Sequence, residues 1–223
     1  MPDEMMNQFS LDLFDLEKID NQKYPEIVTF PSGAPMPDGE VIIYQNFFEE
    51  LESNQLFKEL ESGISWQQDR IKMFGKEFNL PRLTAWYGDQ GKSYTYSGIT
   101  MAPTPWNPVL LLIKARIEKV VSLEFNSVLA NLYRHGQDHM SWHSDDEREL
   151  GKNPIIASVS FGETRRFLLR HKYDRELEKL EVSLNNGSLL IMQGSTQHFW
   201  KHQIPKTAKK INPRINLTFR FIK

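Results

Sequence analysis

The sequence predicts an α+β protein that is mainly β, with helices ahead of a sandwich or barrel of short strands. From residue 125 onward, short β-prone segments alternate with turn signals such as Asn185-Asn186-Gly187. Two amphipathic helical patterns precede these segments. The chain has 223 residues, and single all-β domains often have about 200–250, so we expect one domain.

The segments before residue 125 predict an arm, a strand and two helices. Residues 1–40 are expected to form an N-terminal arm, and residues 41–223 the domain itself, which begins with a strand at 41–44. Apolar residues recur with helical spacing in 47–62, and a second helix is expected at 109–123, after two prolines. Residues 64–104 mix aromatic residues with Gly and Pro, which indicates hairpins and loops.

The strands expected after the second helix are rich in β-branched and aromatic residues and are bounded by turns. No internal repeat or low-complexity tract interrupts the pattern. The predicted strands comprise 127–133, 155–161, 166–171, 180–182, 188–192 and 214–222.

The composition excludes several classes of protein. The chain has no cysteine, which excludes disulfide scaffolds, thiol nucleophiles and iron–sulfur clusters. No apolar run approaches the roughly 20 residues of a membrane span, and the acidic N-terminus does not look like a signal peptide. We therefore expect a cytoplasmic protein (nuclear if eukaryotic), and a monomer by default.

The net charge is −2, yet residues 201–223 hold seven Lys or Arg and no acid, which indicates either an anion-binding end or ordinary scatter.

The last predicted strand has two different faces, because side chains alternate along a strand. If its apolar face packs against helices, its polar face points into the barrel, where two arginines need anionic partners. A dicarboxylate ligand would supply such partners through bidentate bonds, whereas the alternative is a solvated polar face. The apolar face has Ile215, Leu217, Phe219 and Phe221, and the polar face has Arg214, Asn216, Thr218 and Arg220.

The strand at 127–133 follows the same alternation. Asn131 and Tyr133 share one face with Leu129, and the intervening apolar residues share the other. A polar pair on one face of a strand can hydrogen-bond a ligand carboxylate.

A metal site is indicated by His143 and Asp145, whose side chains point the same way in an extended chain. His198 and His202 lie further along, and either can supply a third ligand. Two His and one carboxylate, with open coordination positions, form the facial triad of non-haem Fe(II) oxygenases. A bare His-x-Asp is common, but its combination with a distal His and two arginines on one strand face is more specific.

Together these residues resemble the AlkB family of Fe(II)- and 2-oxoglutarate-dependent dioxygenases, most closely its branch that repairs alkylated bases in duplex DNA. The resemblance covers roughly residues 70–223 and implies a double-stranded β-helix (jelly roll) core with N-terminal helices packed against it. Its motifs are Phe74-Gly75-Lys76, Tyr87-Gly88-Asp89, Tyr94-Thr95-Tyr96-Ser97-Gly98, Asn131-Leu132-Tyr133, His143-Ser144-Asp145-Asp146-Glu147, Ala157-Ser158-Val159-Ser160-Phe161-Gly162 and Pro213-Arg214-Ile215-Asn216-Leu217-Thr218-Phe219-Arg220.

The resemblance implies cofactors and the residues that bind them. Fe(II) would be held by His143, Asp145 and His202, since His202 rather than His198 precedes the matching Ile-Pro step. The co-substrate 2-oxoglutarate would chelate the iron and place its distal carboxylate on Arg214, and O2 would complete the reaction. The residues implied for 2-oxoglutarate are Asn131, Tyr133, Arg214, Asn216, Thr218 and Arg220.

The resemblance also implies DNA as the partner. Phe74, with Gly75 and Lys76, would form a hairpin tip that enters the stack where a base is flipped out. Tyr94 and Tyr96 would border that base, Asp146 would contact it, and Arg82 would steady the opposite strand or the backbone. Hydroxylation of the N-methyl group of N1-methyladenine or N3-methylcytosine would release formaldehyde and restore the base. Candidate phosphate contacts are Lys72, Lys76, Arg82, Arg165, Arg166, Arg170, Lys172, Lys206, Lys209 and Lys210.

Three alternatives remain at this stage. The same chemistry could act on RNA or on single-stranded DNA only. The protein could be a non-catalytic module that binds alkylated DNA, although such a module does not need open iron positions. A hydroxylase of proteins or small molecules would leave the Phe74 hairpin and the basic C-terminal end without a role.

Overall fold

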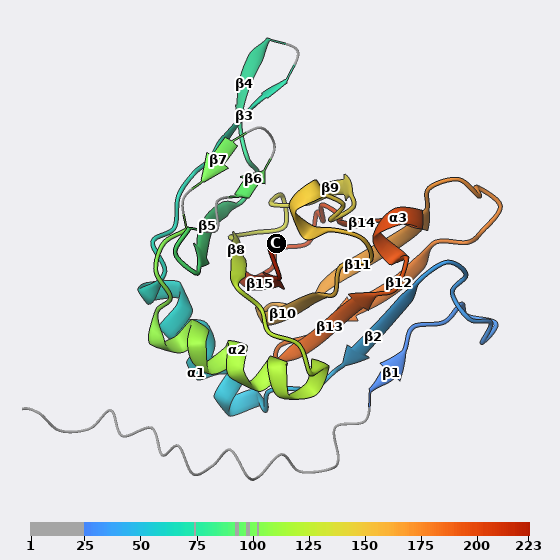
Figure 1. Cartoon of the computed structure of the whole chain (residues 1–223), viewed down its shortest axis with the longest axis horizontal. Helices are drawn as coiled ribbons and strands as arrows, with labels where there is room; N and C mark the ends of the chain where they lie inside the picture. The colour runs from blue at the N-terminus through green and yellow to red at the C-terminus, as the bar shows by residue number, and fades with distance from the viewer. Residues whose placement is uncertain (1–24, 74, 92–93, 97–98, 102) are drawn as a thin grey trace, which may run out of the picture.

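Two antiparallel sheets that face each other form the body of the molecule (Figure 1). The computed structural model describes residues 25–73, 75–91, 94–96, 99–101 and 103–223. The larger sheet has the strand order β1-β2-β13-β10-β15-β8-β5, and the smaller sheet has the order β12-β11-β14-β9. Strands distant in sequence are neighbours in both sheets, as in a jelly roll, so the predicted fold class is confirmed.

The elements have the following bounds. The strands are β1 (Glu26–Ile27), β2 (Glu40–Tyr44), β3 (Arg70–Met73), β4 (Lys76–Asn79), β5 (Leu83–Gly88), β6 (Tyr94–Tyr96), β7 (Ile99–Met101), β8 (Ser127–Tyr133), β9 (Met140–His143), β10 (Ile156–Gly162), β11 (Arg165–His171), β12 (Leu180–Leu184), β13 (Ser188–Gln193), β14 (Trp200–Ile204) and β15 (Arg214–Arg220). The helices are α1 (Glu50–Gly63), α2 (Pro108–Val121) and α3 (Thr196–Phe199). Within the described residues, no helix is long and apolar enough to cross a membrane.

Helices α1 and α2 cover the outer face of the larger sheet (Figure 1). Helix α2 begins where the Asn107 side chain accepts a hydrogen bond from the Leu110 amide, with Pro108 in the first turn, where a missing amide costs nothing. The helix ends at Ser122, which has a left-handed backbone with φ 52°. The apolar side chains of both helices pack on the outward residues of β8, β10 and β15 and form one core.

A second core lies between the two sheets. It joins inward residues of the larger sheet, such as Leu129 and Leu190, to Phe167, Leu169 and Trp200 of the smaller sheet. Part of this space is polar, because the hydrophilic side chains on the inward face of β15 line it. The predicted alternation of β15 and β8 is therefore confirmed between residues 214 and 220 and between 127 and 133. Phe221 lies beyond the end of β15 and is 43% exposed, which differs from its predicted place on the apolar face.

Several elements differ from the expectations. Within residues 64–104, which predict hairpins and loops, β3–β4 and β6–β7 are paired as hairpins, but β5 is an edge strand of the larger sheet. Strands β9 and β14 and helix α3 have no counterpart among the predicted elements. From residue 25, the predicted arm pairs β1 with β2 and buries Val28, Phe30 and Met36 in the second core.

Candidate active site

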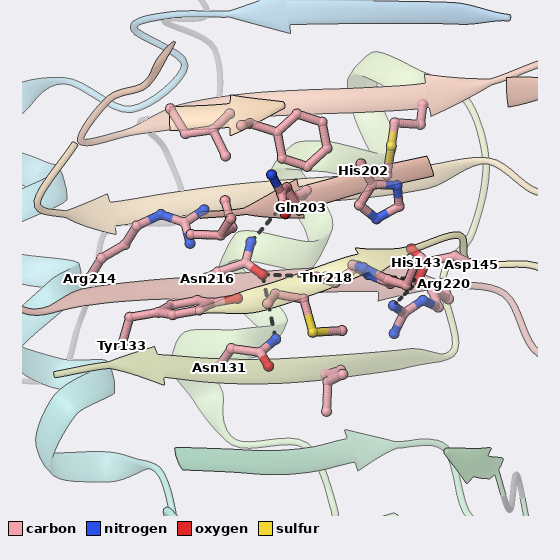
Figure 2. A pocket seen from close by; sticks show the side chains of 17 residues that line it. Asn131, Tyr133, His143, Asp145, His202, Gln203, Arg214, Asn216, Thr218 and Arg220 are labelled. Atoms are coloured by element: carbon pink, nitrogen blue, oxygen red, sulfur yellow. Dashed lines mark hydrogen bonds and ion pairs between the residues drawn. The ribbon is translucent and has the colours of Figure 1, made fainter. Parts of the chain in front are cut away.

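His143, Asp145 and His202 come together at one end of the polar space between the sheets (Figure 2). Each offers one ligand atom, and these atoms all lie within 4.8 Å of one another. His143 ends β9, and His202 is its cross-strand partner in β14, so the register of two strands aligns the two imidazoles. Asp145 follows two residues after His143 and is 1% exposed. This donor set fits the facial triad that binds Fe(II).

The surroundings of the cluster orient its ligand atoms. The His143 Nδ1 atom lies 2.8 Å from the carbonyl oxygen of Ser141. A hydrogen on Nδ1 that donates to this carbonyl leaves Nε2 as the unprotonated atom that faces the cluster. The Asp145 amide donates to Oε1 of Gln197, 2.9 Å away in α3. Strand β9 and helix α3 thus hold the ligands before any metal binds.

Burial and charge set the protonation states of the three side chains. Burial, together with the neighbouring His143, lowers the pKa of His202 to about 3. Burial also lowers the pKa of His143. Burial alone would raise the pKa of Asp145, but Arg220 and the two histidines outweigh it and lower that pKa to about 2. At neutral pH the site therefore presents two neutral imidazoles and one carboxylate, the forms that bind a metal.

The polar row of β15 runs from this cluster to the opposite end of the pocket, where Arg214 lies (Figure 2). The Nη2 atom of Arg214 donates to the Ser160 hydroxyl at 2.8 Å, and its guanidinium carbon lies 5.2 Å from the centre of the Tyr133 ring. Its Nε and Nη1 atoms are buried without a hydrogen-bond partner among the described residues. Burial lowers the pKa of Arg214 to about 10, which leaves the guanidinium charged at neutral pH. A carboxylate placed here would satisfy two buried donors, so the residues present fit the distal carboxylate of 2-oxoglutarate.

Between these ends, the remaining predicted residues form a connected polar wall. Asn131 Nδ2 lies 3.5 Å from Asn216 Oδ1, which also accepts a bond from the Thr218 hydroxyl at 3.0 Å. Arg82 is 1% exposed and donates from Nε to Asn131 Oδ1 at 2.7 Å. A guanidinium buried this deeply does not reach a phosphate at the surface, so the prediction that Arg82 steadies the DNA backbone is corrected: Arg82 supports the pocket wall.

Arg220 lies at the metal end of the same pocket. It lines the pocket, but its Nη2 atom donates to Asp145 Oδ1 at 2.8 Å. The two side chains are 3% and 2% exposed, so this is a buried ion pair at the metal end. Arg220 therefore orients a predicted iron ligand, and its predicted part in binding 2-oxoglutarate stays a prediction.

The remaining predicted residues lie nearer the surface. His198 of α3 accepts a bond from the Asn153 amide and is not part of the cluster, which agrees with the choice of His202. Asp146 is half exposed and forms an ion pair with Lys172. Gly75 follows the hairpin strand β3 with φ +77°, a conformation that glycine adopts without strain. Phe74 lies outside the described residues, and Lys76, Tyr94 and Tyr96 are described only for their backbone, in β4 and β6.

Sequence reasoning missed the residues that support the site from neighbouring elements. Ser158 and Ser160 bond Asn216 and Arg214, and their alternation with apolar residues in 155–161 could have placed them on the inner face. Gln197 left no such signal, because α3 was not predicted. Arg165 was expected at phosphates, but it is 4% exposed and donates to the carbonyls of Asp138 and Pro205.

Comparison with known proteins agrees with this geometry. The model of the 2OG-Fe(II) oxygenase superfamily matches residues 40–220, so the protein is a 2-oxoglutarate-dependent dioxygenase that uses Fe(II), 2-oxoglutarate and O2. Human "Alpha-ketoglutarate-dependent dioxygenase alkB homolog 3" is 42% identical over 92% of this chain and 72% of its own length. Human "DNA oxidative demethylase ALKBH2" is 42% identical over 80% of this chain and 72% of its own length.

The chain belongs to the AlkB family of these oxygenases. The solved structure of OsALKBH1 superposes with a TM-score of 0.60 and covers 81% of this chain and 97% of its own. Since the sequence identity of that pair is 16%, the superposition supports the fold alone.

Proposed function

We propose that the protein is an oxidative demethylase of N-alkylated bases in DNA, with N1-methyladenine and N3-methylcytosine as its substrates. The observation that carries the proposal is the pocket that joins a two-His, one-carboxylate cluster to a buried arginine with unsatisfied donors. The similarity to a relative named as a DNA oxidative demethylase supports DNA as the substrate.

Each end of the pocket has a separate task in this proposal. His143, Asp145 and His202 would hold Fe(II), which, together with 2-oxoglutarate and O2, supplies the oxidation of a C–H bond. Arg214 would hold the distal carboxylate of 2-oxoglutarate, while Tyr133, Asn131, Asn216 and Thr218 would line the path between the two ends. Arg220 would keep Asp145 ionised and oriented.

Asp146 and the two hairpins would position the target base. The N1-methyladenine and N3-methylcytosine bases carry a positive charge that is lost on demethylation, so a carboxylate beside the pocket favours damaged over restored bases. Asp146 is adjacent in sequence to Asp145 and is half exposed, which suits contact with a base that enters from solution. Phe74, which falls between β3 and β4 in the sequence, would fill the gap in the stack, and Tyr94 and Tyr96 would border the extruded base.

The test is direct repair of a defined lesion. Iron-loaded protein is incubated with 2-oxoglutarate, ascorbate, O2 and an oligonucleotide that carries one N1-methyladenine. We expect the mass of one methyl group to be lost, formaldehyde to be released, and both to disappear in His143→Ala and Arg214→Ala. Parallel single-stranded DNA, duplex DNA and RNA substrates measure the strand preference.

Other outcomes would redirect the proposal. Succinate without repair on any of these strands would keep the iron chemistry and point to a different substrate, such as a protein. Binding of alkylated DNA by iron-loaded protein, with neither repair nor succinate, would favour a binding module.

A further inference from the structure

Lys172 lies close to the metal cluster, beside Asp146, which directly follows Asp145 in the chain. It is the first residue after β11, and its Nζ atom lies 3.0 Å from Asp146 Oδ2 and 2.8 Å from the carbonyl oxygen of Gln197. Its side chain is 13% exposed, whereas that of Asp146 is 53% exposed. A lysine with two hydrogen bonds and this burial is not placed like a phosphate contact on an open surface, which corrects its inclusion among the candidate phosphate contacts.

The neighbours of Lys172 hold its ammonium in this position. The Lys172 amide donates to the carbonyl of Phe199 at 2.7 Å. The preceding residue, His171, stacks on Phe199 at 6.0 Å between ring centres. Gln197 accepts from Lys172 through its carbonyl and from the Asp145 amide through its side chain, so α3 connects Lys172 to the metal cluster. The position of the ammonium is therefore built into the fold.

The electrostatic environment of an entering base depends on the summed charge of Asp146 and Lys172. The Lys172 bond occupies one oxygen of Asp146, and no described residue bonds the other, Oδ1. Without Lys172, Asp146 would present a full negative charge, which favours a cationic base over a neutral one. With Lys172, the pair has no net charge, and this preference is weaker. A unit charge at about 7 Å in a hydrated site, where the effective dielectric constant is about 35–80, changes such an equilibrium by about three- to tenfold.

We propose that Lys172 determines the selectivity of the base pocket for charge: it offsets Asp146 and thereby allows neutral alkylated bases to be processed beside cationic ones. This rests on the proposed function, in which Asp146 contacts the target base. Lys172 is thus a specificity-determining residue that acts through Asp146.

The experiment compares one cationic and one neutral lesion in the same single-stranded oligonucleotide: N1-methyladenine and N3-methylthymine. The ratio of their kcat/KM values is measured for the wild type, Lys172→Gln, Lys172→Arg and Lys179→Gln, each holoenzyme checked for an unchanged melting profile. Lys179 is an exposed residue between β11 and β12, so Lys179→Gln makes the same charge change away from Asp146.

We expect Lys172→Gln to raise the ratio in favour of N1-methyladenine by about three- to tenfold. The change should appear mainly in KM, because the substitution alters only the charge beside the bound base. The increase should shrink as ionic strength rises. Lys172→Arg, which keeps the charge, and Lys179→Gln should retain the wild-type ratio. The salt dependence and the rescue by arginine distinguish this role from mechanical support of Asp146.

Three results would overturn the inference. An unchanged ratio in Lys172→Gln, including equal losses on both lesions, would show that Lys172 only supports the structure. An equal change in Lys179→Gln would assign the effect to net charge. A wild type that forms succinate but repairs neither lesion would refute the proposed function and the inference with it, an outcome visible before any variant is made.

Discussion

Arg214 and Arg220 lie on the same face of the same strand and are buried alike, at 1% and 3% exposure, yet their charges are satisfied differently. Arg220 pairs with Asp145 inside the protein. Arg214 donates to the neutral hydroxyl of Ser160 and forms no ion pair with any of the described residues. A buried charge paired within the protein stabilises its partner, whereas one left incomplete is available to a ligand. The two arginines therefore differ in their charge partners, although their positions on one face of β15 make them look equivalent in the sequence.

The largest expected effect is on stability at the metal end. Arg220→Met leaves the Asp145 carboxylate buried without its cationic partner, so we expect the free energy of unfolding to fall by about 3–5 kcal/mol. Urea denaturation of the metal-free protein measures this change. The double variant Arg220→Met/Asp145→Leu removes both charges and should recover most of the loss. A fall of less than about 1 kcal/mol in Arg220→Met would contradict the assignment of a structural pair.

The next effect is on ligand binding at the opposite end. Arg214→Met removes the charged donors expected to bind the distal carboxylate, so we expect the Kd of 2-oxoglutarate to rise about 100-fold. Stability without 2-oxoglutarate should change by less than about 1 kcal/mol, because no anionic partner is left behind. Calorimetric titration and urea denaturation measure the two quantities, and Arg214→Lys, which keeps the charge but loses the planar fork, should bind with intermediate affinity. The comparison fails if Arg214→Met destabilises the protein as much as Arg220→Met does.

A smaller effect follows from the neutral histidines beside Arg220. The folded pKa of His202 is about 3, whereas an unfolded histidine has a pKa of about 6.5. Between these values the unfolded chain binds a proton that the folded site excludes, so stability falls as pH is lowered. For His202 alone, lowering the pH from 7.5 to 5.5 should reduce the free energy of unfolding of the metal-free protein by about 1.4 kcal/mol.

Urea denaturation at the two pH values checks this expectation, with His202→Gln as the matched variant. The variant should lose about 1.4 kcal/mol less than the wild type over the same interval. Equal losses in the two proteins would show that the folded His202 takes up a proton as readily as the unfolded one.

The sequence predicts the positions of the charged groups better than their partners. Strand alternation places Arg214 and Arg220 in the interior, and the jelly roll brings His143, Asp145 and His202 together as expected. Alternation cannot show that Arg220 pairs with Asp145, because that contact joins a strand to a loop distant in sequence. For the same reason Gln197 and Lys172 were not identified as supports: their roles depend on α3, a single short turn that has too few residues for a periodic signal.

The smallest expected effect tests whether burial, rather than bond length, gives the Arg220 pair its importance. Arg166 and Glu181 form two bonds of 2.7 and 2.6 Å, at least as short as the 2.8 Å bond between Arg220 and Asp145. Their side chains are 62% and 45% exposed, however, so water and salt screen the attraction. A double-mutant cycle with Arg166→Ala and Glu181→Ala should give a coupling of about 0.5 kcal/mol, reduced by added salt. A coupling as large as the loss in Arg220→Met would mean that geometry alone decides the strength of these pairs. A weak coupling would assign the strength of the Arg220 pair to the desolvation that an unpaired Asp145 would suffer.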